Sequence, residues 1–223
     1  MRDKRKDSGY FEVFLKHQNS RIDKYSNKLA ETNDQDKQQR ILTSLVKYYV
    51  DVIKADFSAG ADKKKLSALL TKACRTAAEY KKNVSETLLV LISFAIMLNQ
   101  KEAVKELIKN NESMISANRL LSYFAGAVTR NDGKWDCSIK LPPEYAWLDP
   151  VFETEDPGIQ TEKLQNYLNY YWYPNHAEYA WYDSDSKDTN TYCGYWSFES
   201  AALVETLGLN EQDFEGMEYY PAI

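Results

Sequence analysis

The longest apolar run in the chain covers eleven residues, from Leu88 to Leu98, and only Ser93 interrupts it. A helix that crosses a bilayer needs about 20 apolar residues, so this run is too short to span a membrane. A helix that is apolar on nearly all sides must lie at the centre of a fold, with other helices packed around it. We therefore predict a buried helix over about residues 85–98.

Helical spacing of apolar residues continues through most of the remaining sequence. The chain holds 8 Gly and 6 Pro, and no segment sustains the alternation that is typical of strands. Gly60 is expected to end one helix, and Asp62 is a suitable N-cap for the next. Further helices are predicted over about residues 10–29, 42–58, 62–80, 101–109, 112–128, 161–172, 175–182 and 196–207. The expected fold is all-α, a multi-helix bundle of antiparallel helices without a significant sheet.

The middle of the chain differs from its two ends. Residues 131–160 contain Gly133, Pro142, Pro143, Pro150 and Pro157, and we predict an irregular, Pro-rich connector there. The connector separates an N-terminal helical part, residues 1–130, from a C-terminal acidic aromatic helical part, residues 161–223. We expect these parts to pack together as one globular unit.

The charge of the chain changes sign near the connector. Residues 1–150 carry 26 Lys and Arg against 19 Asp and Glu, whereas residues 151–223 carry 2 against 14. The acidic third also holds 16 of the 30 aromatic residues. Carboxylates combined with aromatic rings are typical of a surface that binds a basic protein, because the carboxylates attract the partner and the rings anchor it.

Two acidic clusters are candidates for this surface. One combines carboxylates with aromatic anchors and consists of Glu178, Trp181, Tyr182, Asp183, Asp185 and Asp188. The other consists of Glu153, Glu155 and Asp156. The sequence alone leaves the choice between the two clusters open. The acidic balance argues against direct contact with nucleic acid, because carboxylates and phosphates repel each other.

Catalytic and metal-binding interpretations have little support in the sequence. The only histidines are His17 and His176, and a Cys193–His176 pair is the one arrangement that could form a nucleophile and base. The run Asp183 to Asp188 faintly resembles a calcium loop, but it lacks the Gly and the Glu that such a loop needs. We expect no catalytic residue, no metal and no cofactor. The three cysteines, without metal-like spacing, and the charged start of the chain indicate a cytoplasmic protein with reduced thiols.

Several segments resemble the polymorphic nuclease immunity proteins, the PoNi family. The longest is Tyr192–Leu209, which reads YCGYWSFESAALVETLGL, and it is followed by the sequence Tyr219-Tyr220-Pro221. The preceding Trp181–Ser184, the pair Tyr10-Phe11 and the Phe57–Gly60 helix end are also similar to that family. The resemblance therefore covers nearly the whole chain, and its C-terminal motif is the more specific part.

The resemblance implies an all-helical, cytoplasmic immunity protein that is not an enzyme. Such a protein binds and neutralises a cognate DNase toxin of the restriction-endonuclease-like superfamily, which other cells deliver through a specialised secretion system. Within the motif, Gly194, Tyr195, Trp196 and Phe198 are interpreted as structural residues, and Glu199 as a buried carboxylate paired with an Arg. An alternative function is a helical adaptor or scaffold for a different basic protein. The oligomeric state stays open.

Overall fold

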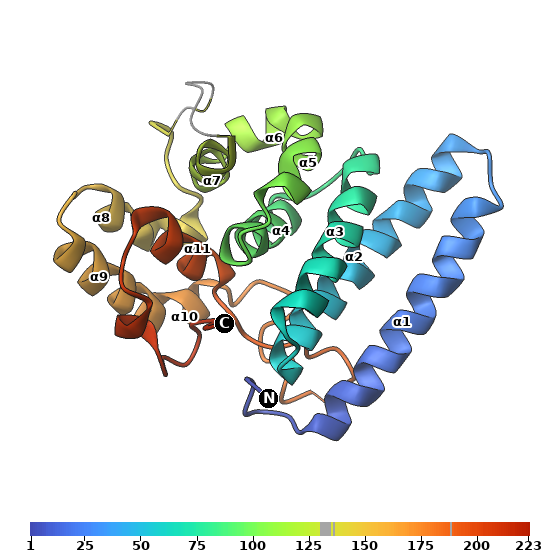
Figure 1. Ribbon diagram of the computed structural model, residues 1–223, viewed down its shortest axis with the longest axis horizontal. Helices are drawn as coiled ribbons and strands as arrows, with labels where there is room; N and C mark the ends of the chain where they lie inside the picture. The colour runs from blue at the N-terminus through green and yellow to red at the C-terminus, as the bar shows by residue number, and fades with distance from the viewer. Residues whose placement is uncertain (130–134, 136, 188) are drawn as a thin grey trace.

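The computed structural model describes residues 1–129, 135, 137–187 and 189–223, and it contains no strand within these residues. The long helices α1 (Ser8–Ala30), α2 (Gln35–Ala59) and α3 (Lys63–Glu79) lie side by side (Figure 1). Next come α4 (Ser85–Met97), the 3-10 helix η1 (Lys101–Val104), α5 (Lys105–Asn110), α6 (Glu112–Ser116) and α7 (Arg119–Thr129). The C-terminal part forms α8 (Asp149–Phe152), α9 (Pro157–Asn166), α10 (Trp172–Asn175) and α11 (Phe198–Leu207). The all-α prediction is confirmed.

Local signals set the ends of the long helices. Asp7, Asp34 and Asp62 are the N-caps of α1, α2 and α3, and each carboxylate accepts a hydrogen bond from a backbone N–H of the first turn. Gly60 ends α2 in the left-handed conformation, with φ of 91°. The predicted helix end at Gly60 and the predicted N-cap at Asp62 are both confirmed.

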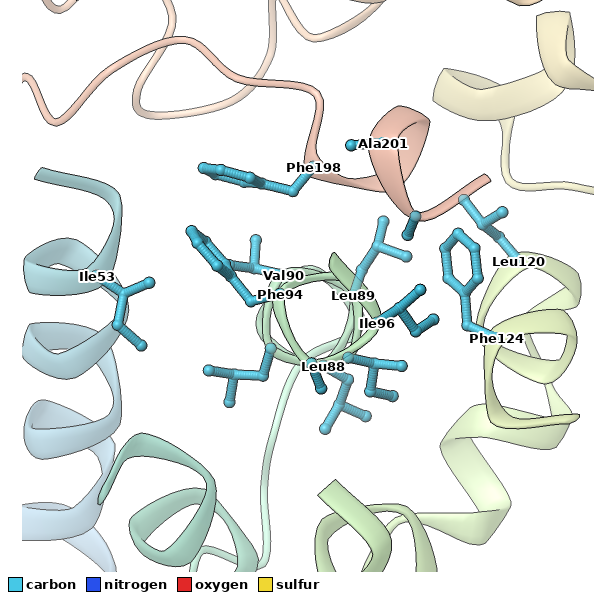
Figure 2. Packing of buried hydrophobic residues seen from close by; sticks show 14 of the residues in the cluster. Ile53, Leu88, Leu89, Val90, Phe94, Ile96, Leu120, Phe124, Phe198 and Ala201 are labelled. Carbon is cyan, nitrogen blue, oxygen red and sulfur yellow. The ribbon is translucent and has the colours of Figure 1, made fainter. Parts of the chain in front are cut away.

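Helix α4 lies at the centre of the molecule, as its apolar run predicts. All residues from Leu88 to Ile96 are buried. Figure 2 looks along α4 and shows Ile53 of α2, Phe124 of α7 and Phe198 of α11 around it. Across the residues that the structure describes, no helix is both long and apolar enough to cross a membrane.

Helix α11 packs the C-terminal part onto this central helix. The ring centroid of Phe198 lies 4.2 Å from that of Phe94 in α4 and 5.4 Å from that of Phe57 in α2. The Ser197 N–H, just before α11, donates a 2.9 Å hydrogen bond to the Tyr219 carbonyl. One hydrophobic cluster consequently contains residues from both ends of the chain.

The predicted connector contains more helix than its sequence suggested. Within it, residues 131–134 and 136 lie outside the described part of the chain. Beyond them, Pro143 begins the 3-10 helix η2 (Pro143–Leu148), Pro150 lies in the first turn of α8, and Pro157 begins α9. Proline is tolerated in a first turn because the N–H that it lacks has no intrahelical partner there. These prolines therefore start helices, and the prediction of an irregular segment was wrong at this point.

Two of the predicted helices also differ from the structure. Residues 112–128 divide into α6 and α7, which are separated by Ala117 and Asn118. Residues 176–182 form turns where the prediction extended a helix to Tyr182. The turns bring the Trp181 ring into contact with α10, and its indole N–H donates a hydrogen bond to Glu86 of α4. These tertiary contacts override the local preference for helix.

Between α9 and α10, the segment η3 (Tyr167–Tyr171) is π-helical. The last regular segment is the 3-10 helix η4 (Glu211–Phe214).

Candidate functional site

The segment between α10 and α11 carries the first acidic cluster, and the start of the chain holds this segment in place. Tyr192 is fully buried, and its hydroxyl donates a hydrogen bond to the Asp3 carboxylate. The Tyr192 carbonyl accepts a 2.9 Å hydrogen bond from the Tyr10 hydroxyl. These contacts join residues that are more than 180 positions apart in the sequence. The path of the acidic segment is therefore fixed by tertiary contacts.

We call residues 178–187 the acidic loop. Its two described aspartates accept hydrogen bonds from tyrosines: Asp183 from Tyr173 at 2.7 Å, and Asp185 from Tyr195 at 2.7 Å. Burial, and after it these hydrogen bonds, raise the pKa of both tyrosines. Asp183 also adopts a positive φ of 53°. Each carboxylate therefore stabilises the loop, although Asp183 remains exposed to solvent.

The other predicted members of this cluster have different surroundings. Trp181 is half-buried, stacks on Trp172 with ring centroids 5.5 Å apart, and donates a 3.2 Å hydrogen bond to Glu86. Tyr182 is half-buried and stacks on Tyr173 at 4.4 Å. Glu178 is exposed. Asp188, the remaining predicted member, lies outside the described residues.

Trp181 also lines a small cavity of about 30 Å³, which has room for about one water molecule. Its lining includes the charged side chains of Lys54, Glu86 and Glu199. Burial lowers the pKa of Lys54, but neighbouring groups, among them the carboxylates of Glu86, Asp51 and Glu199, raise it by more, so the net pKa is above its ordinary value. Lys54 consequently keeps its charge beside this cavity.

Glu199 is a buried carboxylate, but its partners differ from the predicted ones. It is 6% exposed and accepts hydrogen bonds from Ser197 at 2.6 Å and Tyr167 at 3.3 Å. The expected arginine does not appear among the ion pairs of the described residues, and the basic half instead contributes Lys54 through electrostatic attraction. Hydroxyl donors can satisfy a buried carboxylate without a direct ion pair.

The remaining motif residues hold α11 against α2. Trp196 donates a 2.8 Å hydrogen bond from its indole N–H to the Ser58 hydroxyl, and Ser58 donates one of 2.8 Å to the Cys193 carbonyl. Gly194 has φ of 107°, and a Cβ at this position would clash with both the Ser58 hydroxyl and the Trp196 indole. Tyr195 is buried under the acidic loop.

The second acidic cluster lies between α8 and α9, at the opposite end of the molecule from α1 (Figure 1). Glu153, Glu155 and Asp156 are all exposed. Asp156 is the N-cap of α9 and accepts hydrogen bonds from the N–H groups of Gly158 at 2.8 Å and Ile159 at 3.0 Å. The acidic tail lies beside α9, because Gln165 donates a 2.8 Å hydrogen bond to the Asp213 carbonyl.

Residues of η2, α8, α9 and η3 form a groove that sequence reasoning missed, and we call it the aromatic groove. Its volume is about 400 Å³, and its lining residues are Trp147, Pro150, Lys163, Asn166, Tyr167, Tyr170 and Tyr171. Trp147 is 48% exposed and Tyr170 is 65% exposed. The sequence gives only a partial signal of this groove. It shows that the pair Tyr170-Tyr171 follows the apolar pair Tyr167-Leu168 on the same helical segment. Nothing local indicates that Trp147 lies opposite this pair.

The Cys193–His176 pair has surroundings that suit packing. Cys193 is buried, and burial raises the pKa of its thiol to about 12, so it stays protonated at neutral pH. His176 is buried, and its Nδ1 lies 2.5 Å from the Trp172 carbonyl oxygen. His17 lies on α1 and is exposed. The surroundings of Cys193 therefore suit an ordinary packed thiol.

Two protein-family descriptions match nearly the whole chain. The N-terminal model of the PoNe immunity proteins (PoNi) matches residues 2–109, and the C-terminal model of the same proteins matches residues 116–222. The chain belongs to the PoNi family. The resemblance inferred from the Tyr192–Leu209 motif is thereby confirmed, and the function of the chain is immunity to a polymorphic nuclease toxin. Neither a curated protein nor a solved structure matches this PoNi chain.

Proposed function

We propose that this PoNi protein binds a cognate DNase toxin directly in the cytoplasm and neutralises it without any chemistry of its own. The contact surface consists of carboxylates from residues 151–223. The observation that carries the proposal is the charge imbalance of this segment, 2 basic against 14 acidic residues, within a chain of the PoNi family.

The proposal has a simple electrostatic basis. A DNase must present positive charge where the DNA backbone binds. The complex with an inhibitor that covers this region is stabilised when the carboxylates of the inhibitor occupy the places of the phosphates. Long-range attraction also accelerates binding to about 10⁸–10⁹ M⁻¹s⁻¹ at low salt, compared with about 10⁵–10⁶ M⁻¹s⁻¹ for neutral surfaces. Fast association suits a protein that must intercept an incoming toxin.

The two acidic clusters are unequally suited to this role. The Asp183 and Asp185 carboxylates already accept hydrogen bonds from tyrosines, so a partner would have to share them. Within the described part of the chain, no hydrogen bond or ion pair engages the exposed side chains of Glu153 and Glu155. We therefore place the main contact at the α8–α9 cluster and a secondary contact at the acidic loop, with Glu178 as its freest carboxylate.

A protection assay tests this proposal. The purified chain is titrated against the nuclease domain encoded by the neighbouring reading frame, and cleavage of plasmid DNA is measured. We expect protection to reach its end point at a one-to-one ratio, as a stoichiometric inhibitor requires. Full cleavage in the presence of a large molar excess of the chain would contradict the proposal. Capture of a basic partner that lacks nuclease activity, combined with the absence of protection, would favour an adaptor.

A further inference from the structure

The two ends of the chain meet around one arginine. The Arg5 guanidinium donates a hydrogen bond to the Glu218 carboxylate, and its Nε lies 3.9 Å from Oδ2 of Asp185. The same guanidinium lies over two tyrosine rings, 5.1 Å from the ring centroid of Tyr195 and 5.6 Å from that of Tyr219. We call these two carboxylates and two rings the arginine cage. In Figure 1 the first and last residues of the chain accordingly lie near each other.

The walls of the arginine cage are held by contacts that do not involve Arg5. The Tyr195 hydroxyl donates a 2.7 Å hydrogen bond to Oδ1 of Asp185. The Tyr219 ring stacks on the ring of Tyr173, with an interplanar angle of 3° and centroids 5.3 Å apart. We therefore expect the cage to keep its shape when the Arg5 side chain leaves it.

The backbone beside Arg5 is also fixed independently of the Arg5 side chain. The N–H groups of Arg2 and Asp3 donate hydrogen bonds of 2.9 Å and 3.0 Å to the Ser58 carbonyl at the end of α2. The Asp3 carboxylate in turn accepts a 2.8 Å hydrogen bond from the Arg5 N–H. The guanidinium can consequently swing out of the cage while the backbone of residues 2–5 stays in place.

Arg5 occupies the cage loosely. Its side chain is 25% exposed, and those of Asp185 and Glu218 are 30% and 63% exposed, so solvent reaches all three groups. No hydrogen bond from the described residues reaches Oδ2 of Asp185, because a separation of 3.9 Å from Arg5 is too long for one. Partly exposed ion pairs hold weakly, since water competes for both charges. A second cation that reaches the cage can therefore displace Arg5 at a small cost.

The present occupant shows which chemical group the cage accepts. A planar guanidinium can stack on the two rings while its N–H groups face the two carboxylates, and a basic nuclease can present the same group on an arginine. Asp185 belongs to the acidic loop, which is the secondary contact of the proposed function. Arg5 neutralises part of this surface in the free chain.

We propose that Arg5 is an internal occupant of the arginine cage, and that an arginine side chain of the toxin replaces it in the complex. This inference rests on the proposed function and deepens it. It names Asp185 and Glu218 as contacts of the toxin, and Arg5 as the residue that covers them until the toxin binds.

Removal of Arg5 tests this inference through the affinity for the nuclease domain encoded by the neighbouring reading frame. Arg5→Ala empties the cage, so the toxin displaces no competitor, and the Kd should fall by about fivefold or more. Lys4→Ala is the matched control, because it removes the same charge one residue earlier. Lys4 is exposed, and within the described part of the chain no ion pair or hydrogen bond engages its side chain.

The salt concentration separates the local effect from the change in net charge. At about 150 mM NaCl, attraction beyond about 8 Å is largely screened, so the Kd of Lys4→Ala should stay within about twofold of that of the unchanged chain. Circular dichroism verifies that both variants are folded.

A second comparison locates the effect of Arg5. In a chain that carries Asp185→Asn and Glu218→Gln, the negative charges that Arg5 covers are absent, while the Asn side chain can still accept a hydrogen bond from Tyr195. Adding Arg5→Ala to this chain should change the Kd by less than about twofold. An undiminished gain in affinity in this background would mean that Arg5 acts elsewhere, and the assignment would be overturned.

The outcomes distinguish this inference from the proposed function. If the unchanged chain fails to bind the nuclease, both are wrong. If it binds, and Arg5→Ala binds no more tightly than Lys4→Ala, the cage is not a contact of the toxin while the proposed function stands. If Arg5→Ala binds more weakly, Arg5 positions the acidic loop for binding, and its role as a competitor is refuted.

One measurement needs no variant. The NMR signal of the Arg5 Nε–H group in the unchanged chain should move on addition of the nuclease to the position of a solvent-exposed arginine. A signal that stays in place while the complex forms would show that Arg5 remains in the cage, against the proposed replacement.

Discussion

Replacement of Gly194 by alanine tests how the C-terminal motif attaches to the rest of the chain. Gly194 precedes α11 and lies where the Ser58 hydroxyl of α2 meets the Trp196 indole. Its φ of 107° is one that residues with a side chain rarely adopt. An added methyl group would therefore strain the backbone and separate Ser58 from Trp196.

Two contributions determine the expected loss of stability. Forcing alanine to a positive φ costs about 1–2 kcal/mol. Disruption of the partly buried hydrogen bond from Trp196 to Ser58 costs about 1–3 kcal/mol more, because the separated groups lose their partners. The free energy of unfolding should fall by about 2–5 kcal/mol in total. For a chain of this size, each kcal/mol lowers Tm by about 2–4 °C, so Tm should fall by about 4–20 °C.

Gly208 provides the matched control. It also has a positive φ, 68°, but a Cβ there would meet no atom within 4 Å. Gly208→Ala should therefore show only the conformational cost of about 1–2 kcal/mol. Urea unfolding followed by tryptophan fluorescence measures both variants. Equal losses in the two variants would refute the argument that contact with Ser58 and Trp196 requires glycine at position 194.

Three further predictions concern charge and protonation. Glu153→Gln combined with Glu155→Gln should slow association with the nuclease and reduce its dependence on salt, as measured by stopped-flow fluorescence; an unchanged rate would place the contact elsewhere. Burial raises the pKa of Asp51 to about 6, although the nearby Lys54 opposes this rise. The protonated form of Asp51 therefore contributes stability that is complete below about pH 4 and is lost as the pH rises through about 6. In urea titrations, Asp51→Asn should therefore gain stability relative to the unchanged chain as the pH rises from about 4.5 to about 7.5. A difference in the free energy of unfolding that stays the same at every pH would contradict the raised pKa. Cys193→Ala should retain full protection of DNA, whereas loss of protection in a folded variant would revive the thiol hypothesis.

The sequence predicts those parts of the fold that local chemistry determines. The end of α2 at Gly60 follows from a left-handed glycine, and the start of α3 follows from the Asp62 cap. The central place of α4 follows from an apolar surface on all sides of one helix. None of these predictions requires knowledge of distant residues, and all three are confirmed.

The sequence fails where distant contacts decide the outcome. The turns after His176 form because Trp181 reaches Glu86, which is 95 residues earlier. The Asp185 carboxylate looks free in the sequence, but it lies 3.9 Å from the guanidinium of Arg5, near the other end of the chain. The aromatic groove depends on a π-helical turn and on the approach of η2, and neither has a local signature.

We propose that this PoNi protein recognises its toxin through negative charge. The association rate with the nuclease domain, measured from about 20 mM to about 500 mM NaCl, tests it most directly, because screening at about 500 mM shortens the range of the attraction to a few ångströms. We predict that the rate falls by at least about tenfold over this range, while the dissociation rate changes little. A tight complex that forms at the same rate at every salt concentration would contradict the claim.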